Sequence, residues 1–145
     1  MDLFSHEYFM KKALQQATLA LEKNEIPVGA IIVIDNHIIA QSHNLTELLN
    51  DVTAHAEMQA ITAASNTLSG KYLKDCTLYV TLEPCQMCAG ALYWSQISNL
   101  VFGANDNQRG FQTLGTKLHP KTKVISGILA NECSDLLFKF FKNKR

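Results

Sequence analysis

The sequence predicts a layered α/β fold with a mixed sheet. Apolar, β-branched runs that are typical of strands alternate with segments of helical periodicity along the 145 residues. The turn Asp35-Asn36 separates the first two strands, and strands joined by a two-residue turn run antiparallel. With 47% hydrophobic and 18% charged residues, the chain has enough apolar side chains for a core. Its length suits a single domain over 1–145.

The N-terminal half predicts a helix, a β-hairpin and a second helix. Ser5 is a candidate N-cap for a helix over 6–23, in which apolar residues recur at helical spacing. Apolar, β-branched residues over 28–34 and 37–41 predict the two strands of the hairpin. The segment 55–64 is rich in alanine and methionine, which favours a helix.

The C-terminal half predicts further strands and helices in alternation. Residues 76–82 are largely apolar and predict a third strand, and Pro84 suits the start of an alanine-rich helix over 85–94. The remaining predicted elements are a fourth strand over 97–102, an irregular polar stretch over 103–121, a fifth strand over 123–126 and a closing helix over 131–143.

Charge and hydropathy limit the classes of function. The 13 lysines and arginines equal the 13 aspartates and glutamates, so the net charge cannot by itself attract a polyanion. The basic cluster near the C-terminus is either a solvated helix end or a contact for RNA, and it comprises Lys139, Lys142, Lys144 and Arg145. No apolar stretch reaches 18 residues and no secretory signal is visible, so we expect a cytoplasmic protein with no membrane contact.

The cysteines predict either a metal site or a redox motif. Cys85 and Cys88 lie one helical turn apart at a predicted helix N-terminus, where the helix dipole favours the thiolate form that binds zinc. Alone, the pair is equally compatible with a thioredoxin-type redox motif. Cys76 and Cys133 are isolated in apolar contexts, and we interpret them as small buried hydrophobic residues.

The segment His55-Ala56-Glu57 favours a catalytic zinc, because it adds a third ligand and a carboxylate at another helix start. Three protein ligands leave the fourth tetrahedral position open to water, whose pKa zinc lowers toward neutrality. Glu57 is then the candidate proton shuttle between the water, a ring nitrogen and a departing amine. Residues two apart do not share a helix face, so His55 and Glu57 converge only if the helix points end-on at the metal.

Together these residues resemble the cytidine deaminase-like zinc deaminases, and most closely the bacterial tRNA-specific adenosine deaminases. The likeness runs from about Ser5 to the end of the chain. The motifs that carry it are His55-Ala56-Glu57, Pro84-Cys85-Gln86-Met87-Cys88-Ala89-Gly90, Ile26-Pro27-Val28-Gly29-Ala30, Thr77-Leu78-Tyr79-Val80-Thr81-Leu82-Glu83 and Val101-Phe102-Gly103-Ala104.

The resemblance implies a three-layer α/β/α fold with a five-stranded mixed sheet, and one Zn²⁺ per chain on His55, Cys85 and Cys88. It also implies a homodimer that acts on a tRNA anticodon stem-loop and converts the wobble adenosine, position 34, to inosine. The segment Leu92-Tyr93-Trp94 is a candidate dimer contact or, equally, ordinary core packing.

By position, the resemblance also implies contacts with the substrate. Asn44 would hold the target nucleoside, Val28 would line the base pocket, the Ala56 N–H would support the developing anionic centre, and Asp106 would contact a neighbouring nucleotide. Three of these residues have ordinary structural explanations as well, with Asn44 in a turn, Val28 in the core and Asp106 capping a loop.

Two alternatives to this function stay open. The same machinery could deaminate a free base or nucleoside, such as guanine, cytosine or cytidine, because substrate choice depends on pocket shape and flanking loops. Segment 108–122 departs from the small residues usual in the family, with Arg109-Gly110-Phe111-Gln112 in their place. A non-catalytic zinc module that binds RNA or a partner is the second alternative, and it would need a fourth protein ligand such as His119 or Cys76.

Overall fold

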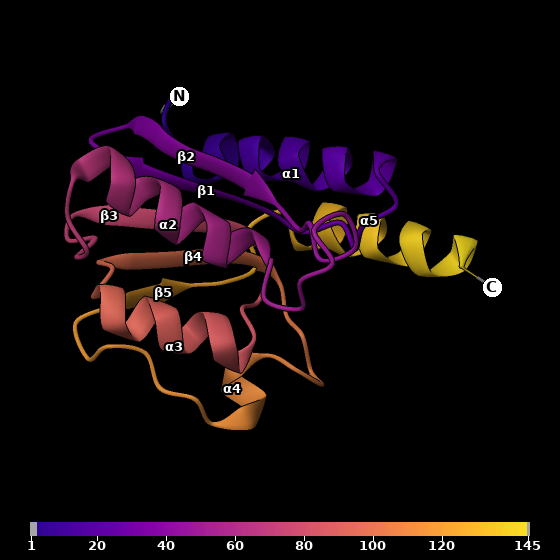
Figure 1. Cartoon of the computed structure of the whole chain (residues 1–145). Coiled ribbons are helices and arrows are strands. Elements are labelled where there is room, and N and C mark those ends of the chain that lie inside the picture. The colour runs from indigo at the N-terminus through magenta and orange to yellow at the C-terminus, as the bar shows by residue number, and fades with distance from the viewer. Residues whose placement is uncertain (1–2, 145) are drawn as a thin grey trace.

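A five-stranded mixed sheet lies between two layers of helices in the computed structural model, which describes residues 3–144 (Figure 1). The strands are β1 (Gly29–Ile34), β2 (His37–His43), β3 (Cys76–Leu82), β4 (Asn99–Ala104) and β5 (Lys123–Ile125), in the spatial order β2-β1-β3-β4-β5. Strand β1 is antiparallel to both β2 and β3, whereas β3, β4 and β5 run parallel. The predicted α/β/α fold with a five-stranded mixed sheet is therefore confirmed.

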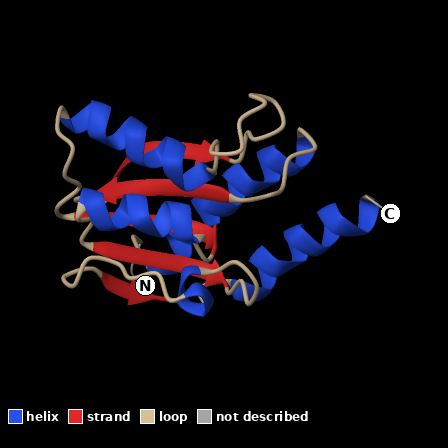
Figure 2. Ribbon diagram, turned by 60° about the horizontal axis from the view of Figure 1, so that its bottom comes forward, coloured by secondary structure: helices blue, strands red, loops and turns tan. Residues whose placement is uncertain are grey.

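The helices cover the two faces of the sheet in pairs. Helices α1 (His6–Glu22) and α5 (Ala130–Asn143) pack on one face, and α2 (Ala56–Leu68) and α3 (Gln86–Ser95) lie on the other (Figure 2). Successive residues of a central strand enter opposite layers, as Ile31 does beneath α1 and Ile32 beneath α2 and α3. Because both faces are covered, the central strands appear in the sequence as continuous apolar runs.

Local signals at the first helix and the first turn are confirmed. The Ser5 hydroxyl accepts a hydrogen bond from the backbone N–H of Tyr8 at 3.1 Å, which caps α1. Asp35 and Asn36 adopt the positive φ values of 48° and 63° that a tight hairpin turn requires. Cys76 and Cys133 are buried, as predicted.

Several element boundaries differ from the prediction. Helix α2 continues four residues beyond 64, because packing buries Ala64 and the helix ends only where Ser69 adopts a left-handed conformation. Strand β4 begins two residues later than predicted, since Ile97 is buried before the strand starts. The stretch predicted to be irregular contains a short helix, α4 (Phe111–Leu114).

Helix α5 carries the basic cluster beyond the sheet. Lys139, Lys142 and Lys144 are exposed, whereas Arg145 lies outside the described residues. The C-terminal end of α5 extends past the edge of the other elements (Figures 1 and 2). Within residues 3–144, no helix has the length and apolarity needed to span a membrane.

Candidate active site

Two helices on the same face of the sheet begin with the residues that predict zinc chemistry. His55 is the N-cap of α2, with Glu57 in the first turn, and Cys85 is the N-cap of α3 with Cys88 in its first turn. His55 and Cys85 therefore lie one position outside the helices in which they were predicted. The end-on arrangement brings His55 and Glu57 to the same cavity although they are two residues apart.

The ligand atoms of His55, Cys85 and Cys88 have the spacing of a tetrahedral zinc site. They lie within 4.8 Å of one another, and His55 Nδ1 is 3.6 Å from each of the two cysteine sulfurs. Zinc bonds of about 2.05 Å to nitrogen and 2.3 Å to sulfur, at the tetrahedral angle, place nitrogen about 3.6 Å from sulfur. The three side chains therefore fit zinc without rearrangement.

The thiols of Cys85 and Cys88 have very different pKa values. The hydrogen bond with Cys88, followed by the contact with His55, lowers the pKa of Cys85 to about 4, although burial opposes this. The hydrogen bond with Cys85, together with burial, raises the pKa of Cys88 far above that of an ordinary thiol. One thiolate therefore faces His55 even before a cation is bound, which prepares the site for a metal.

Glu57 is buried beside the candidate ligands and lines the cavity with His55 and Cys85. Burial raises its pKa to about 7. A carboxyl group with such a pKa can both accept and release a proton near neutral pH. Glu57 is not part of the ligand cluster, so its oxygens are available for proton transfer.

The structure argues against a closed structural zinc site. Among residues 3–144, the cluster of candidate ligands consists of His55, Cys85 and Cys88, and neither His119 nor Cys76 joins it. The His119 ring is tilted against Tyr93 with the ring centroids 5.8 Å apart, and its Nδ1 accepts a hydrogen bond from the Lys121 N–H. The fourth position that the non-catalytic alternative requires is thus not filled by a described side chain.

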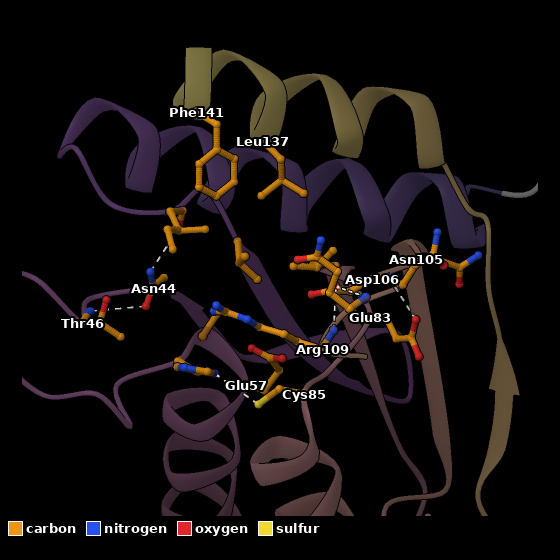
Figure 3. Close-up of a pocket in the computed structure, with 17 residues that line it drawn as sticks. Asn44, Thr46, Glu57, Glu83, Cys85, Asn105, Asp106, Arg109, Leu137 and Phe141 are labelled. Atoms are coloured by element: carbon orange, nitrogen blue, oxygen red, sulfur yellow. Dashed lines mark hydrogen bonds between the residues drawn. The ribbon is translucent and has the colours of Figure 1, made fainter. Parts of the chain in front are cut away.

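A cavity of about 640 Å³ opens onto the ligands (Figure 3). Val28, Asn44, Ala56 and Asp106, the four predicted substrate contacts, all line it. Leu137 and Phe141 point into it from α5, so one wall comes from the C-terminal helix (Figure 3). The other lining residues are Ile26, Thr46, His55, Glu57, Leu82, Glu83, Cys85, Asn105, Asn107, Gln108 and Arg109.

Asn44 and Asp106 also hold their own loops. The Asn44 amide donates to the carbonyl of Ile26 at 3.4 Å, and its oxygen accepts from the N–H of Thr46 at 3.3 Å. Asp106 Oδ1 accepts from the backbone N–H groups of Gln108 and Arg109 at 3.1 and 3.0 Å. The capping interpretation of Asp106 is therefore correct, and its second carboxylate oxygen is free of these bonds.

Sequence reasoning missed two buried carboxylates that hold the rims of the cavity. Glu25 is 1% exposed and accepts from the N–H groups of Glu47 and Leu48 at 3.0 and 2.7 Å. Glu83 is 4% exposed and accepts from the N–H groups of Asp106 and Gln112, both at 3.0 Å. Each carboxylate fixes one loop. Glu83 ends one of the motifs shared with the family, but nothing in that motif indicates that its carboxylate holds a loop, and Glu25 lies outside the motifs.

A sequence profile of the cytidine and deoxycytidylate deaminase zinc-binding region matches residues 4–104. The chain therefore belongs to the cytidine and deoxycytidylate deaminase family. Because the match covers the zinc-binding region and the ligand spacing fits a tetrahedral ion, zinc is the cofactor.

Within this family, the chain is similar over nearly its whole length to tRNA-specific adenosine deaminases. The protein of that name from Bacillus subtilis is 43% identical over 96% of this chain and 90% of its own length. The one from Aquifex aeolicus is 46% identical, covering 96% of this chain and 95% of the relative. A structure solved in studies of A-to-I editing by tRNA:A34 deaminases is 40% identical, with a TM-score of 0.82 over 90% of this chain and 99% of that one.

A guanine deaminase is also similar, over a shorter span. The X-ray structure of the Bacillus subtilis enzyme is 42% identical, with a TM-score of 0.67, and the match covers 70% of this chain and 65% of that one. The matches to tRNA-specific deaminases thus extend over more of both chains.

Proposed function

We propose that this protein deaminates adenosine to inosine at the wobble position of a tRNA anticodon, with zinc-activated water as the nucleophile. The observation that carries the proposal is the grouping of His55, Cys85 and Cys88 with the buried Glu57 at one cavity. The tRNA-specific relatives, which match nearly the whole chain, support the choice of substrate. A cytoplasmic location is part of the same proposal.

The residues divide the reaction between metal binding and proton transfer. His55, Cys85 and Cys88 would hold the zinc ion, which would lower the pKa of a water molecule and so supply the nucleophile for ring carbon C6. Glu57 takes a proton from that water and delivers it to the adjacent ring nitrogen. It then takes the second proton, from the hydroxyl now on C6, and passes it to the departing amine, so that adenosine and water yield inosine and ammonia.

The remaining cavity residues bind and orient the nucleoside. Val28 lines the base pocket, and Asn44 holds the nucleoside through its amide, which already bridges the backbone of the cavity wall. The N–H of Ala56, at the N-terminus of α2, supports charge that develops at the ring. Asp106 contacts a neighbouring nucleotide through the carboxylate oxygen that does not cap its loop.

A substrate comparison tests the proposal. A stem-loop RNA with adenosine at the wobble position should react far better than adenosine, cytidine, cytosine or guanine at equal concentration, because an anticodon loop presents an unpaired base at little unstacking cost. Sequencing total tRNA after incubation, to detect adenosine-to-inosine changes, identifies the natural position. Faster turnover of guanine or another free compound would contradict the tRNA assignment.

The exposed lysines of α5 form part of the proposed RNA footprint. Replacing Lys139, Lys142 and Lys144 by alanine should weaken stem-loop binding and leave the zinc content unchanged. Because the net charge is zero, affinity should fall with salt more gently than for a strongly basic protein. Unchanged stem-loop affinity in the triple variant would remove α5 from the footprint.

The protein is further proposed to act as a homodimer. Leu92 is fully buried in the core, but Trp94 is 77% exposed and stacks edge-on with Tyr93 at the end of α3. An exposed aromatic pair is typical of an association surface. Because Trp94 is the chain's single tryptophan, its fluorescence should shift to longer wavelength as a dimer dissociates on dilution. A monomer mass by light scattering at micromolar concentration would contradict the dimer.

A further inference from the structure

The loop between β4 and α4 presents one arginine to the catalytic cavity. Among the lining residues, Arg109 alone carries a permanent positive charge. Figure 3 shows it among the side chains that face the cavity with Glu57 and Asn44. Within residues 3–144, its guanidinium has no hydrogen-bond or ion-pair partner. A free guanidinium at an active site is suited to bind an oxyanion of the substrate.

Hydrogen bonds fix the backbone that carries this arginine. The Arg109 N–H donates to Asp106 Oδ1 at 3.0 Å, and the next N–H, of Gly110, donates to the Asp106 carbonyl at 2.9 Å. The Asp106 N–H donates in turn to the buried Glu83 carboxylate. This chain of bonds makes 106–110 a closed turn, with Arg109 near its tip.

The same turn is attached to the start of α3, where Cys85 is a proposed zinc ligand. The Phe111 N–H donates to the Pro84 carbonyl at 2.9 Å, and Gly110 forms an isolated antiparallel bridge with Cys85. A side chain on Gly110 would collide with the Asp106 carbonyl and the Glu83 carboxyl, so the close approach requires glycine. The position of the Arg109 backbone is thus set relative to the metal centre.

We infer that Arg109 binds a phosphate of the substrate RNA next to the target adenosine, and thereby favours an RNA-linked nucleoside over a free one. This inference rests on the proposed function, because it assigns the substrate's phosphodiester to a residue of the same cavity. A guanidinium can donate two parallel hydrogen bonds to a phosphate. Glu83 is a positioning residue for it, since it acts through the backbone of the turn. Asp106 holds the same turn through Oδ1, in addition to its proposed contact with a nucleotide.

Kinetics of Arg109→Ala and Arg109→Lys test the inference. Loss of one phosphate contact should raise KM for the stem-loop about tenfold with little change in kcat, and should reduce the salt slope of stem-loop binding by about 0.7 to 1. Lysine keeps the charge without the paired donors and should give an intermediate KM. Lys74→Ala is the matched control, because it removes an exposed cation just before β3, at the end opposite to the cavity.

The outcomes separate this inference from the proposed function. If the wild-type protein prefers the stem-loop but Arg109→Ala keeps the wild-type KM and salt slope, only the role of Arg109 is overturned, and the proposed function stands. A wild-type protein that does not prefer the stem-loop over adenosine would overturn the proposed function. Adenosine 5′-monophosphate is the third substrate. If the wild-type protein preferred this nucleotide to the stem-loop, and Arg109→Ala lost that preference, the arginine would bind the phosphate of a free nucleotide and the RNA assignment would be overturned.

Discussion

Replacing Glu57 by glutamine should separate proton transfer from metal binding. Glu57 is 4% exposed beside the ligand cluster, and the ligand atoms themselves come from His55, Cys85 and Cys88. Glutamine has nearly the same volume but cannot carry a proton between water and substrate. We expect one zinc per chain in the variant and a kcat lower by about 10² to 10⁴, the range for a general acid–base group.

The same substitution should alter how the stability of the zinc-free protein depends on pH. Burial raises the pKa of Glu57 from 4.5 to about 7, so the folded state binds this proton more tightly than the unfolded chain. The resulting stabilisation is complete below about pH 4.5 and is lost as pH rises through about 7. The rise in pKa corresponds to about 3 kcal/mol, at about 1.36 kcal/mol for each pH unit.

Glutamine has no proton to lose, so the free energy of unfolding of Glu57→Gln, relative to wild type, should increase by up to that amount as pH rises. Urea unfolding of both zinc-free proteins between pH 4.5 and 8 measures the difference. Glu132→Gln is the matched control, because Glu132 is an exposed carboxylate on α5. Elemental analysis measures the zinc content of each variant, and stem-loop deamination measures its kcat.

Two results would refute this reasoning. A Glu57→Gln protein that keeps more than about a tenth of the wild-type kcat would show that another group moves the protons. A stability difference that stays constant across the pH range would show that the buried carboxyl does not titrate as its environment requires.

Three further changes probe the site and its supports. Cys88→Ser should lose both zinc and deamination, because it removes one of three ligands, as elemental analysis will test. In zinc-free protein, iodoacetamide should alkylate Cys85 at a rate that falls only near pH 4, where its thiolate becomes protonated. An alkylation rate that already falls about tenfold for each pH unit below pH 8 would contradict the low pKa of Cys85. An alkylation rate that added zinc does not suppress would contradict its role as a ligand. Glu83→Gln leaves one acceptor oxygen for two N–H groups, and should raise KM for the stem-loop several-fold while zinc content stays at one per chain.

The zinc centre could be predicted from the sequence because its chemistry depends on residue type and short spacing. Two cysteines three positions apart and a histidine at another helix start define ligand types and leave one position open. What spacing could not provide was the convergence of His55 with Cys85, thirty residues away. That convergence requires β2 and β3, both antiparallel to β1, to end at the same edge of the sheet, and α2 and α3 to lie on one face.

The supports of the pocket could not be predicted from the sequence. Glutamate is an exposed residue by default, so nothing local distinguishes Glu25 and Glu83 from solvated side chains. Their burial depends on loops that return from distant segments to donate two backbone N–H groups each. A carboxylate directly after an apolar strand, as in Leu82-Glu83-Pro84, is a weak local signal that such a contact could exist.

The proposed catalytic residues and the proposed substrate contacts lie in different parts of the fold. The proposed zinc ligands lie at the starts of helices that pack on the sheet, whereas the opposite wall of the cavity comes from loops and from α5. Glu25 and Glu83 connect those loops to the core, so a loop can change its tip residues while its base stays fixed. Arg109 lies at such a tip, where a single substitution alters the charge facing the substrate without touching a ligand. Substitutions in 105–112 should therefore change substrate preference at constant zinc content, and those at the two helix starts should abolish the reaction for every substrate.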